Sequence, residues 1–439
     1  MMETKYLTEF YHLPEFKNLD GYRKNGGYIQ LTKALLMQPQ AIIDEVKASG
    51  LRGRGGAGFS TGMKWGFLPK NNEPRYLLCN ADEGEPGTFK DRMMMEKAPH
   101  QLIEGMIISA FAIGSKKSYI YVRGEYEESI TTLLTAIQEA YKAGLLGKNI
   151  LGSGFDHDMD VYRGAGAYIC GEETGMISSL EGLKGQPKLK PPFPAVQGFL
   201  KKPTIVNNVE TLAAVKYILR DGAQGYRKYG TEKSAGTKLF SLSGNVNKPG
   251  NYEVPLAYPL KDMINILGGG IKNGKKLKAV IPGGSSAPVM TAEEVERATL
   301  DYECLAQMGT MLGSGAIIVI DDSKCMVECL ANLTHFYRHE SCGQCTPCRE
   351  GTGWLEKIVH SILSGNGRME DIDLLIKVAD NMKGKTICAL SDAAALPVLS
   401  FVTKFRDEFE YFVQHGKSKV KGTAYKTPNY IADKGHAHA

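Results

Sequence analysis

Three cysteines crowded into seven residues are the strongest chemical signal in the sequence. Cys342, Cys345 and Cys348 lie in the segment ESCGQCTPCREG, residues 340–351. Thiolates at Cys-x2-Cys-x2-Cys spacing can fold around one face of a compact iron–sulfur cluster, whereas tetrahedral zinc sites usually take two ligands from each of two separate knuckles. The spacing therefore predicts a 4Fe-4S cluster, with zinc as the alternative metal.

A fourth ligand has to come from elsewhere, because no Cys-Pro follows Cys348 as it does in the bacterial ferredoxin run. The candidates are Cys304, Cys325, Cys329 and Cys388. Cys388 lies in the expected loop between the third and fourth C-terminal helices, and the first three cysteines lie in the loop between the first and second. Both loops can fall at the same end of an up-and-down bundle. We therefore predict Cys388 as the fourth ligand and interpret Cys325 and Cys329, spaced i, i+4 in a helix, as core residues.

A glycine-rich loop, GRGGAGFSTG at residues 53–62, is the second signal. It contains a formal G-x-G-x-x-G, but the preceding residues 41–49 predict a helix, so the strand that precedes an ordinary dinucleotide-binding loop is missing. A more general interpretation is a ligand cradle. Successive glycine N–H groups can line an anion and let a phosphate or planar ring approach, and Arg54 and Lys64 add positive charge. The alternative is a flexible surface loop.

Two further polar loops follow expected strands, where the carboxyl ends of a parallel sheet present ligand groups. The first, residues 80–91, contains Asn80 and Asp82, whose side chains suit ring edges and ribose hydroxyls; its alternative is a solvated turn with helix-capping acids. The second, GAGAYICGEETG at residues 164–175, combines glycines with Glu172 and Glu173. A glutamate there can accept from both ribose hydroxyls and repel a 2′-phosphate, which predicts a preference for NAD over NADP.

The elements that position these loops alternate between helix and strand from about residue 39 to residue 220. Helices are expected at residues 39–49, 101–114, 129–143 and 208–220, and strands at residues 75–80, 118–123 and 159–163. This alternation predicts an α/β layer with a mainly parallel sheet, whose strand ends carry the chemistry.

The pattern changes twice further along the chain. Short strands at residues 239–246, 252–254, 277–281 and 316–320 predict a small α+β module over residues 238–322. Helices at residues 323–339, 349–364, 369–382 and 391–415, with short connections, predict a bundle over residues 323–415. Residues 416–439 have five lysines and no apolar period, so a disordered basic tail is expected there.

Composition limits the class of protein. The chain has 439 residues, 43% of them hydrophobic and 23% charged, so several folded units are expected and wholesale disorder is excluded. A net charge of +5 is too small to indicate nucleic-acid binding. Apolar stretches are shorter than the roughly 20 residues that cross a bilayer, and the N-terminus resembles neither a secretory nor a transit peptide. Nine cysteines, three of them crowded, favour a metal site in a reducing compartment, so a cytoplasmic location is expected.

Taken together, these segments resemble the NADH-binding flavoprotein subunit of respiratory complex I, called the F subunit in bacteria. GAGAYICGEETG and ESCGQCTPCREG are similar to that family's two signatures, and the likeness extends in order over nearly the whole chain. One departure is Gly175-Met176, where the family usually carries Ala-Leu or a similar pair. The resemblance implies a multidomain α/β fold. Its parts are a Rossmann-like FMN- and NADH-binding domain over residues 1–237, a ubiquitin-like soluble-ligand-binding β-grasp domain over residues 238–322, and a C-terminal four-helix bundle with the iron–sulfur cluster over residues 323–415.

The resemblance also implies which residues bind the cofactors. FMN would lie against Gly53, Gly55, Gly56, Ala57, Lys64, Asn80, Asp82, Glu83, Asn207 and Asn208, with the last two at its phosphate end. NADH would lie over the flavin, with Phe59 and Phe67 stacked on its adenine, although core burial is the more frequent role of an aromatic. The other pocket residues would be Glu85, Tyr168, Gly171, Glu172, Glu173 and Lys190.

Electron counting agrees with a flavin. NADH releases a hydride, which carries two electrons, and an iron–sulfur cluster accepts one electron at a time, so a flavin is needed between them. We expect Glu85 to position the nicotinamide, and the four cysteines to hold the cluster that passes electrons to a partner. The resemblance implies a 2Fe-2S thioredoxin-like subunit and a large iron–sulfur subunit as partners. It also implies a place in the peripheral arm of an NADH-quinone oxidoreductase, on the cytoplasmic side of the inner membrane, without direct membrane insertion.

Two other functions share part of these features. The diaphorase subunit of a soluble NAD-linked hydrogenase or formate dehydrogenase carries the same motifs, often with cysteine-rich extensions. The lack of cysteine before Lys33 and after Gly416 favours the respiratory enzyme. A zinc-stabilised scaffold protein with purely structural glycine loops is the third hypothesis, and zinc without flavin would support it.

Overall fold

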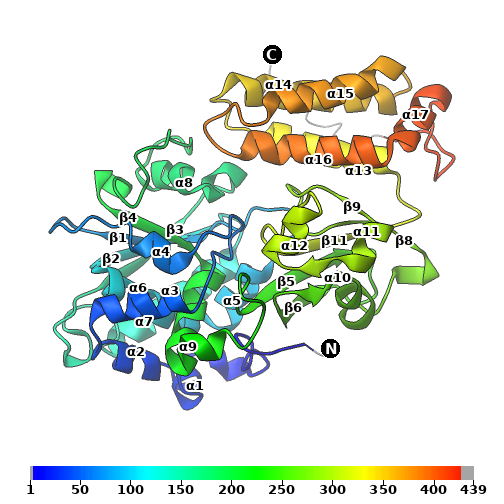
Figure 1. The fold of residues 1–439 in the computed structure, drawn as a ribbon. Helices are drawn as coiled ribbons and strands as arrows, with labels where there is room; N and C mark the ends of the chain where they lie inside the picture. Colours follow the sequence, from blue (N-terminus) through cyan, green and yellow to red (C-terminus); the bar gives the residue numbers. More distant parts are fainter. Residues whose placement is uncertain (1–2, 427–439) are drawn as a thin grey trace. The chain divides into compact units, whose positions relative to one another are not determined.

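A four-stranded parallel sheet, in the order β3-β2-β1-β4, organises the first part of the computed structural model, which describes residues 3–426 (Figure 1). Its strands are β1 (Tyr76–Ala81), β2 (Lys117–Val122), β3 (Asp158–Arg163) and β4 (Thr204–Asn208). β1 pairs in parallel with β2 and β4, and Leu77, Leu78 and Cys79 in it are fully buried. The three predicted strands are confirmed. The sequence does not predict β4, because five residues carry too short a pattern and the pairing with β1 joins distant segments.

Helices form the connections between these strands. They are α3 (Pro39–Ala48), α4 (Thr61–Trp65), α5 (Lys90–Lys97), α6 (Pro99–Ile113), α7 (Glu127–Lys142), α8 (Glu173–Leu180) and α9 (Val209–Tyr226), after the short α1 (Leu19–Lys24) and α2 (Ile29–Ala34). The buried α6 crosses α9 so closely that a Cβ on Gly105 would lie 2.1 Å from the carbonyl oxygen of Leu212. The four helices predicted between residues 39 and 220 are confirmed. The loops that follow the parallel strands therefore emerge at one edge of the sheet.

A second sheet, in the order β6-β5-β11-β8-β9, follows in the sequence (Figure 1). Its strands are β5 (Thr237–Gly244), β6 (Gly250–Pro255), β8 (Leu277–Ile281), β9 (Met290–Thr291) and β11 (Ala316–Asp321). β5 pairs antiparallel with β6, the next strand in the sequence, and parallel with β11. Around the sheet lie α10 (Leu260–Asp262), α11 (Ala292–Arg297) and α12 (Tyr302–Gln307), with a two-stranded pair of β7 (Tyr258–Pro259) and β10 (Thr299–Leu300). The predicted mixture of short strands and helices is confirmed.

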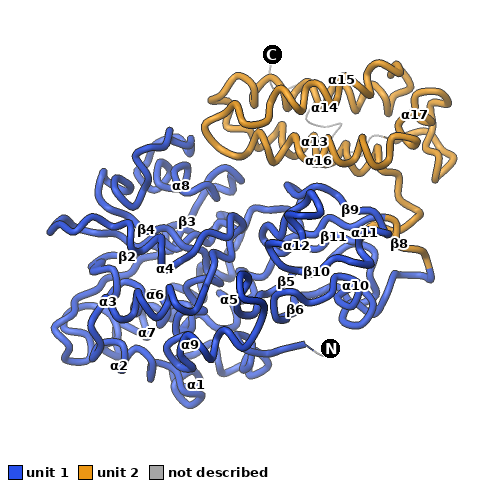
Figure 2. The backbone as a smooth tube through the Cα atoms, in the orientation of Figure 1, with its two compact units in different colours: residues 1–274, 279–319 blue, residues 275–278, 320–439 orange. Residues whose placement is uncertain are grey.

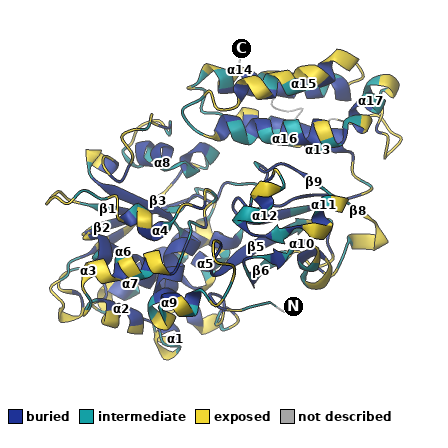
Figure 3. Cartoon of the chain, in the orientation of Figure 1, coloured by how far each residue is buried: buried dark blue, intermediate teal, exposed yellow. Residues whose placement is uncertain are grey.

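Five helices make up the last part of the described chain, up to residue 426. They are α13 (Met326–Glu340), α14 (Thr346–Leu363), α15 (Met369–Met382), α16 (Leu390–Lys404) and α17 (Arg406–His415). α13 and α15 each pack on both α14 and α16, and Leu330, Leu355, Leu375 and Val398 in these helices are buried. Figure 3 colours the buried parts of the helices dark blue. The single helix predicted at residues 391–415 is wrong, because the backbone breaks at Phe405. The apolar period runs through this break, since Phe401, Phe405 and Phe409 are all buried, and so the pattern hides it.

The beginning of the expected tail is packed against the helices. Ser418 is fully buried, Lys419 pairs with Asp407 at 2.8 Å, and Lys421 pairs with Glu328. Residues 416–426 are therefore not the disordered segment that the composition suggests, because these contacts are invisible to a test for apolar periodicity. The rest of the predicted tail, residues 427–439, lies outside the described residues.

The chain divides into two compact units (Figure 2). The first comprises residues 1–274 and 279–319, and the second comprises residues 275–278 and 320–439. This division largely separates the helical region from the two sheets, and the predicted boundary between residues 237 and 238 stays a prediction. Within the described residues, no helix combines the length and the apolar character that a membrane span requires.

Candidate functional site

The glycine-rich loop lies against the N-terminus of α9. An ideal Cβ on Gly55 would lie 3.0 Å from Cβ of Asn208, the N-cap residue of α9, and the backbone N–H of Arg54 donates to Oγ1 of Thr211 at 2.8 Å. Gly56 has φ +138 and open space around its Cβ position. The loop follows α3 and not a strand, as the sequence predicts. Exposed glycine backbone beside the start of an 18-residue helix forms a cradle that suits a phosphate.

Arg54 does not add its charge to the exposed loop, contrary to the sequence interpretation. The residue is 1% exposed, and its Nη2 donates to Oη of Tyr226 and to the carbonyl oxygens of Ala235 and Thr237 at 2.9–3.0 Å. Local sequence shows an arginine between glycines but cannot show that its side chain turns inward. The guanidinium thus links the loop to the end of α9 and to the start of β5.

Lys64, Glu173 and Lys190 form one ionic cluster beside the cradle. Lys64 Nζ contacts Glu173 Oε2 at 2.9 Å and the carbonyl oxygen of Val206 at 3.0 Å, and Lys190 Nζ contacts Glu173 Oε1 at 2.9 Å. The Glu173 side chain is 23% exposed. Burial raises the pKa of this carboxyl, but the two lysines outweigh burial and the net pKa is lowered. Glu173 is therefore a carboxylate flanked by two cations at the cradle's side.

Glu172 is the N-cap residue of α8. Its carboxylate accepts from the N–H groups of Thr174 at 2.8 Å and Gly175 at 2.9 Å, and Lys190 lies 3.0 Å away. α8 begins at Glu173 in spite of Gly175, where a Cβ would lie 2.8 Å from the carbonyl oxygen of Ile169. The departure at Gly175-Met176 thus leaves the helix start intact.

Glu85 joins the loop after β1 to the loop after β8. Its Oε2 accepts from Oη of Tyr168 at 2.7 Å, while its Oε1 accepts from N–H and Oγ of Ser286 at 2.8 and 2.7 Å and from Oγ of Ser285 at 3.4 Å. A Cβ on Gly284 would lie 2.5 Å from Cγ of Glu85. Burial raises the pKa of Glu85, and the donors oppose this rise. Local sequence does not identify either serine as a partner of Glu85, and the Pro-Gly-Gly turn directly before them, residues 282–284, is the signal that it offers.

Polar side chains of the loop after β1 have two roles: Asn80 contacts the loop at Gly171, and Glu83 caps α5. Asn80 donates from Nδ2 to the carbonyl oxygen of Gly171 at 2.7 Å and accepts from the N–H of Asp82 at 3.2 Å, which brings these three predicted residues together. The Glu83 carboxylate instead accepts from the N–H groups of Asp91 at 2.8 Å and Arg92 at 3.0 Å. Burial, followed by the nearby Asp91, raises the pKa of Glu83 to about 7. The helix-capping alternative therefore describes the Glu83 side chain at the start of α5.

Two exposed aromatic rings belong to the glycine-rich loop and to the segment just after α4. Phe59 and Phe67 are 48% and 54% exposed, with ring centroids 5.9 Å apart. Core burial is thus wrong for both. Gly53 lies in the same loop, joined by its N–H to the carbonyl oxygen of Phe59 at 2.8 Å, and Ala57 is exposed beside it.

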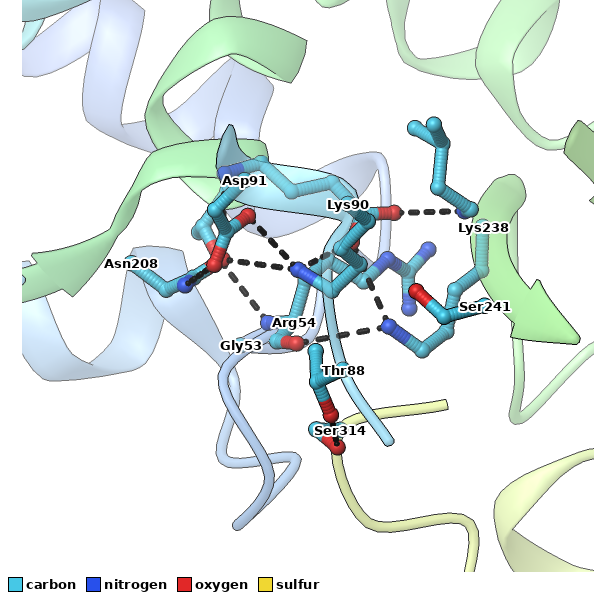
Figure 4. Close-up of polar contacts among 12 residues, drawn as sticks. Gly53, Arg54, Thr88, Lys90, Asp91, Asn208, Lys238, Ser241 and Ser314 are labelled. Atoms are coloured by element: carbon cyan, nitrogen blue, oxygen red, sulfur yellow. Dashed lines mark hydrogen bonds and ion pairs between the residues drawn. The ribbon is translucent and has the colours of Figure 1, made fainter. Parts of the chain in front are cut away.

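Asn207 and Asn208 use their side chains within the protein. Oδ1 of Asn207 accepts from Nε1 of the buried Trp65 at 2.9 Å. Asn208 caps α9 by accepting from the N–H of Glu210 at 3.0 Å, and its Nδ2 donates to Asp91 at 2.6 Å (Figure 4). Both residues lie at the end of β4 beside the glycine loop, but their amides already have partners there.

The four predicted cysteine ligands occupy two loops at one end of the helical unit. Cys342 lies between α13 and α14, Cys345 is the N-cap of α14, and the buried Cys348 lies in its first turn. Burial raises the pKa of Cys348, and the nearby Cys342 and Cys345 add to the rise. The N–H of Ile387, next to Cys388, donates to Sγ of Cys345 at 3.5 Å. The structure thus brings the Cys388 loop to the cysteine triple.

The competing cysteines lie elsewhere. Cys304 is in α12 of the other unit, and Cys325 is the N-cap of α13, with Cys329 one turn further. An α-helix rises about 1.5 Å per residue, so the start of α13 is about 20 Å from the triple at its far end. In residues 3–426, no three His, Cys, Asp or Glu side chains are close enough to hold a single metal ion. A thiolate set around a multi-iron core needs wider spacing than one ion, and sulfur donors suit iron–sulfur clusters.

Three protein-family models match consecutive parts of the chain. Residues 46–217 match the Nuo51 FMN-binding domain, residues 238–320 match the SLBB domain, and residues 328–412 match the NADH-ubiquinone oxidoreductase-F iron-sulfur binding region. These ranges contain the cradle, the loop that holds Glu85, and the cysteine end of the helical unit.

Solved structures share the fold. An NAD+-reducing [NiFe]-hydrogenase in its H2-reduced state is similar with a TM-score of 0.80 and 38% identity; the match covers 88% of this chain and 64% of that chain. The air-oxidized state gives a TM-score of 0.81 and 35% identity, over 93% of this chain and 67% of that chain. This chain therefore spans about two thirds of the hydrogenase chain.

Curated relatives are similar over almost their whole length. The second of the NADH-quinone oxidoreductase F subunits of Rhizobium meliloti is 51% identical over 399 residues, which is 90% of this chain and 94% of the relative. The F subunit of the Mycobacterium bovis enzyme is 50% identical over 413 residues, 93% of this chain and 92% of the relative. With half of the residues identical across nine tenths of both chains, the chain belongs to the family of NADH-quinone oxidoreductase F subunits.

Proposed function

We infer that this chain is the NADH-oxidising subunit of an NADH-quinone oxidoreductase and carries FMN and one 4Fe-4S cluster. The observation that carries this inference is the cradle formed by Gly55, Gly56 and the N-terminus of α9, within the region that matches an FMN-binding domain. Its glycine backbone and helix start suit the phosphate of a flavin mononucleotide. The cysteine end of the helical unit supplies soft sulfur ligands for the second cofactor.

The residues around the cradle have distinct proposed tasks. FMN lies against the glycine loop, with Lys64, Asn80, Asp82 and the turn at Gly171 along its length. The exposed Phe59 and Phe67 offer their faces to the adenine of NADH. Asn207, Asn208 and Glu83, whose side chains have partners inside the protein, serve the flavin by shaping the backbone around it.

Bound FMN supplies the chemistry that takes up a hydride and releases electrons singly. The protein supplies geometry, because hydride transfer needs no side-chain acid or base. Glu85, held by Tyr168 and Ser286, presents a fixed carboxylate to the carboxamide of the nicotinamide. Glu173 accepts from the ribose hydroxyls, with Lys190 and Glu172 at the pocket's border. Cys342, Cys345, Cys348 and Cys388 hold the cluster.

Finer features of the fold and assembly follow from the same inference. The module at residues 238–322 is a ubiquitin-like β-grasp domain, and residues 323–415 form a four-helix bundle extended by α17. Partner subunits with a 2Fe-2S centre and further iron–sulfur centres accept the electrons, on the cytoplasmic side of a membrane. A diaphorase subunit of an NAD-linked hydrogenase is the second candidate, supported by the similar fold of those enzymes. The near-complete overlap with the F subunits of NADH-quinone oxidoreductases favours the respiratory enzyme.

Low-temperature EPR tests this function. Anaerobic protein is measured as isolated, after NADH and after dithionite. A reduced-cluster signal after NADH is the expected result, because it requires a hydride donor and a one-electron centre to communicate through this chain. Zinc in place of iron, together with absence of flavin, would contradict the proposal and support the scaffold hypothesis.

Selectivity for NADH over NADPH is expected to depend on Glu173. In Glu173→Ala, Lys64 and Lys190 lose their shared carboxylate and become free to attract a 2′-phosphate. The ratio of kcat/KM for NADPH to that for NADH should rise about tenfold. Steady-state kinetics with both nucleotides measure the ratio. Glu127→Ala, which removes a 67% exposed carboxylate paired with Arg163, is the control. An unchanged ratio in Glu173→Ala would remove Glu173 from the ribose site.

A further inference from the structure

A network of buried charged side chains contacts the glycine loop of the cradle, and Figure 4 shows four of its members, Arg54, Lys90, Asp91 and Lys238. Lys238 in β5, Lys90 and Asp91 in α5, and Glu210 in the first turn of α9 have side chains at most 4% exposed. Arg54, from the glycine loop, is 1% exposed. The three elements and the loop belong to different parts of the sequence, so the network exists only in the folded chain.

Lys238 touches the cradle itself. Its Nζ donates to the carbonyl oxygen of Arg54 at 3.3 Å and lies 3.2 Å from Oε2 of Glu210. Gly315 leaves room for this side chain, because a Cβ at that position would lie 2.6 Å from Cε of Lys238. The other Glu210 oxygen accepts from the N–H of Leu239 at 2.8 Å. The ammonium therefore sits between the loop that forms the cradle and the helix start behind it.

Three basic side chains of the network face two carboxylates and a third carboxyl group, Glu83, that is only partly ionised near neutrality. Arg54, Lys90 and Lys238 face Asp91 and Glu210, and Lys90 is closer than Lys238 to both acids, with 2.7 Å to Asp91 and 2.8 Å to Glu210. Lys238 thus shares the carboxylate of Glu210 with Lys90, which lies closer to it. Buried charge without a full counter-ion is costly, so an anion placed nearby would stabilise it.

The pKa of Lys238 reflects its burial and the fact that it shares the Glu210 carboxylate with Lys90. Burial lowers its pKa, Glu210 and Asp91 oppose the change, and Lys90 and Arg54 lower it further, to about 7. Glu83, beside Asp91, has a pKa raised to about 7 and so carries only part of a charge near neutrality. A phosphate dianion in the cradle would raise the pKa of the nearby Lys238 ammonium, and the folded protein would take up a proton on binding.

We propose that Lys238 is a positioning residue for the flavin phosphate, supplying the buried counter-charge of the cradle, so that binding of FMN is coupled to proton uptake by this lysine. The inference rests on the proposed flavin function and deepens it. It assigns the SLBB-matching segment a part in cofactor binding, through a residue that lies outside the region matching the FMN-binding domain.

Calorimetric titration of FMN into the flavin-depleted full chain tests the coupling. Two phosphate-free buffers with different ionisation enthalpies are used at pH 8, where the phosphate of FMN, with a second pKa of about 6, is already a dianion. Lys238 starts mostly neutral there, so about half a proton or more should be taken up per FMN. Riboflavin, which lacks the phosphate, should bind without this uptake. FMN affinity should fall as pH rises above 7.

Variants of Lys238 distinguish an effect of its charge on FMN binding from an effect on the structure of the protein. Lys238→Arg keeps a permanent cation, so FMN binding should show no proton uptake and no loss of affinity at pH 8. Lys238→Met should abolish the uptake and weaken FMN binding about tenfold at pH 7. Lys261→Met, which removes a 47% exposed lysine of the same module, should behave as the unaltered chain.

The outcomes are distinguishable. FMN binding without proton uptake at pH 8, or equal uptake with riboflavin, would overturn the role of Lys238 while leaving the flavin function in place. Failure of both flavins to bind would overturn the flavin function itself. If Lys238→Met does not fold, Lys238→Arg decides the proposal: proton uptake that persists in this variant would come from another group, such as Glu83, and would overturn the role of Lys238.

Discussion

Replacement of Cys388 with serine is expected to abolish the EPR signal of the reduced 4Fe-4S cluster. The loop that carries Cys388 is fastened to the cysteine triple by the hydrogen bond from Ile387 N–H to Sγ of Cys345. A serine hydroxyl is a hard, neutral donor and replaces a soft thiolate, so a four-ligand set falls to three. Iron content and the EPR spectrum after dithionite measure the loss. NADH-dependent bleaching of flavin absorbance should survive, because the cradle belongs to the other unit.

Two further cysteine variants make this result specific. Cys304→Ser changes a half-buried cysteine in α12 and should leave iron content and spectrum unaltered. Cys325→Ser changes the N-cap of α13, at the far end of that helix from the triple, and should also retain the signal. A Cys388→Ser protein with full iron and an unaltered spectrum would exclude Cys388 as the fourth ligand.

Replacement of Glu85 with glutamine is expected to lower kcat/KM for NADH about 100-fold. The Glu85 carboxylate accepts four hydrogen bonds, and the N–H of Ser286 is a donor that cannot rotate away. A glutamine amide group would bring N–H donors against these donors, so the side chain would turn or the Ser286 loop would shift. The nicotinamide would then lose its fixed partner, and a small displacement is costly in hydride transfer.

Flavin content and substrate kinetics distinguish this effect from unfolding. FMN absorbance and cluster EPR after dithionite should match those of the unaltered chain, while stopped-flow reduction of the flavin by NADH slows. Ser286→Ala removes only the hydroxyl and keeps the N–H, so a smaller decrease, about tenfold, is expected. Glu127→Gln, at a 67% exposed position, is the matched control. Flavin reduction at an unchanged rate in Glu85→Gln would exclude Glu85 from the nicotinamide site.

Local chemistry and local periodicity could be predicted from the sequence. The spacing of Cys342, Cys345 and Cys348 predicts an iron–sulfur ligand set, because three thiolates on one short loop can face a common centre. The alternation of helices and strands predicts the parallel sheet, since each parallel pair requires a crossover connection. The polar loops after β1 and β3 follow from that topology.

Contacts between distant segments were decided only by the tertiary structure. Ser286 reaches Glu85 across 201 residues and Lys238 reaches the glycine loop across 184, and no local pattern encodes such a pairing. The inward turn of Arg54 and the capping role of Glu83 are hidden for the same reason, because residue type and spacing do not reveal which neighbour a side chain will meet. The spacing of apolar residues shows which face of a segment is buried but not where a helix ends. It therefore continues without interruption through Phe405, although α16 ends there. Sequence thus specifies the chemical groups and the elements that carry them, whereas packing across the fold selects their partners, charge states and orientation.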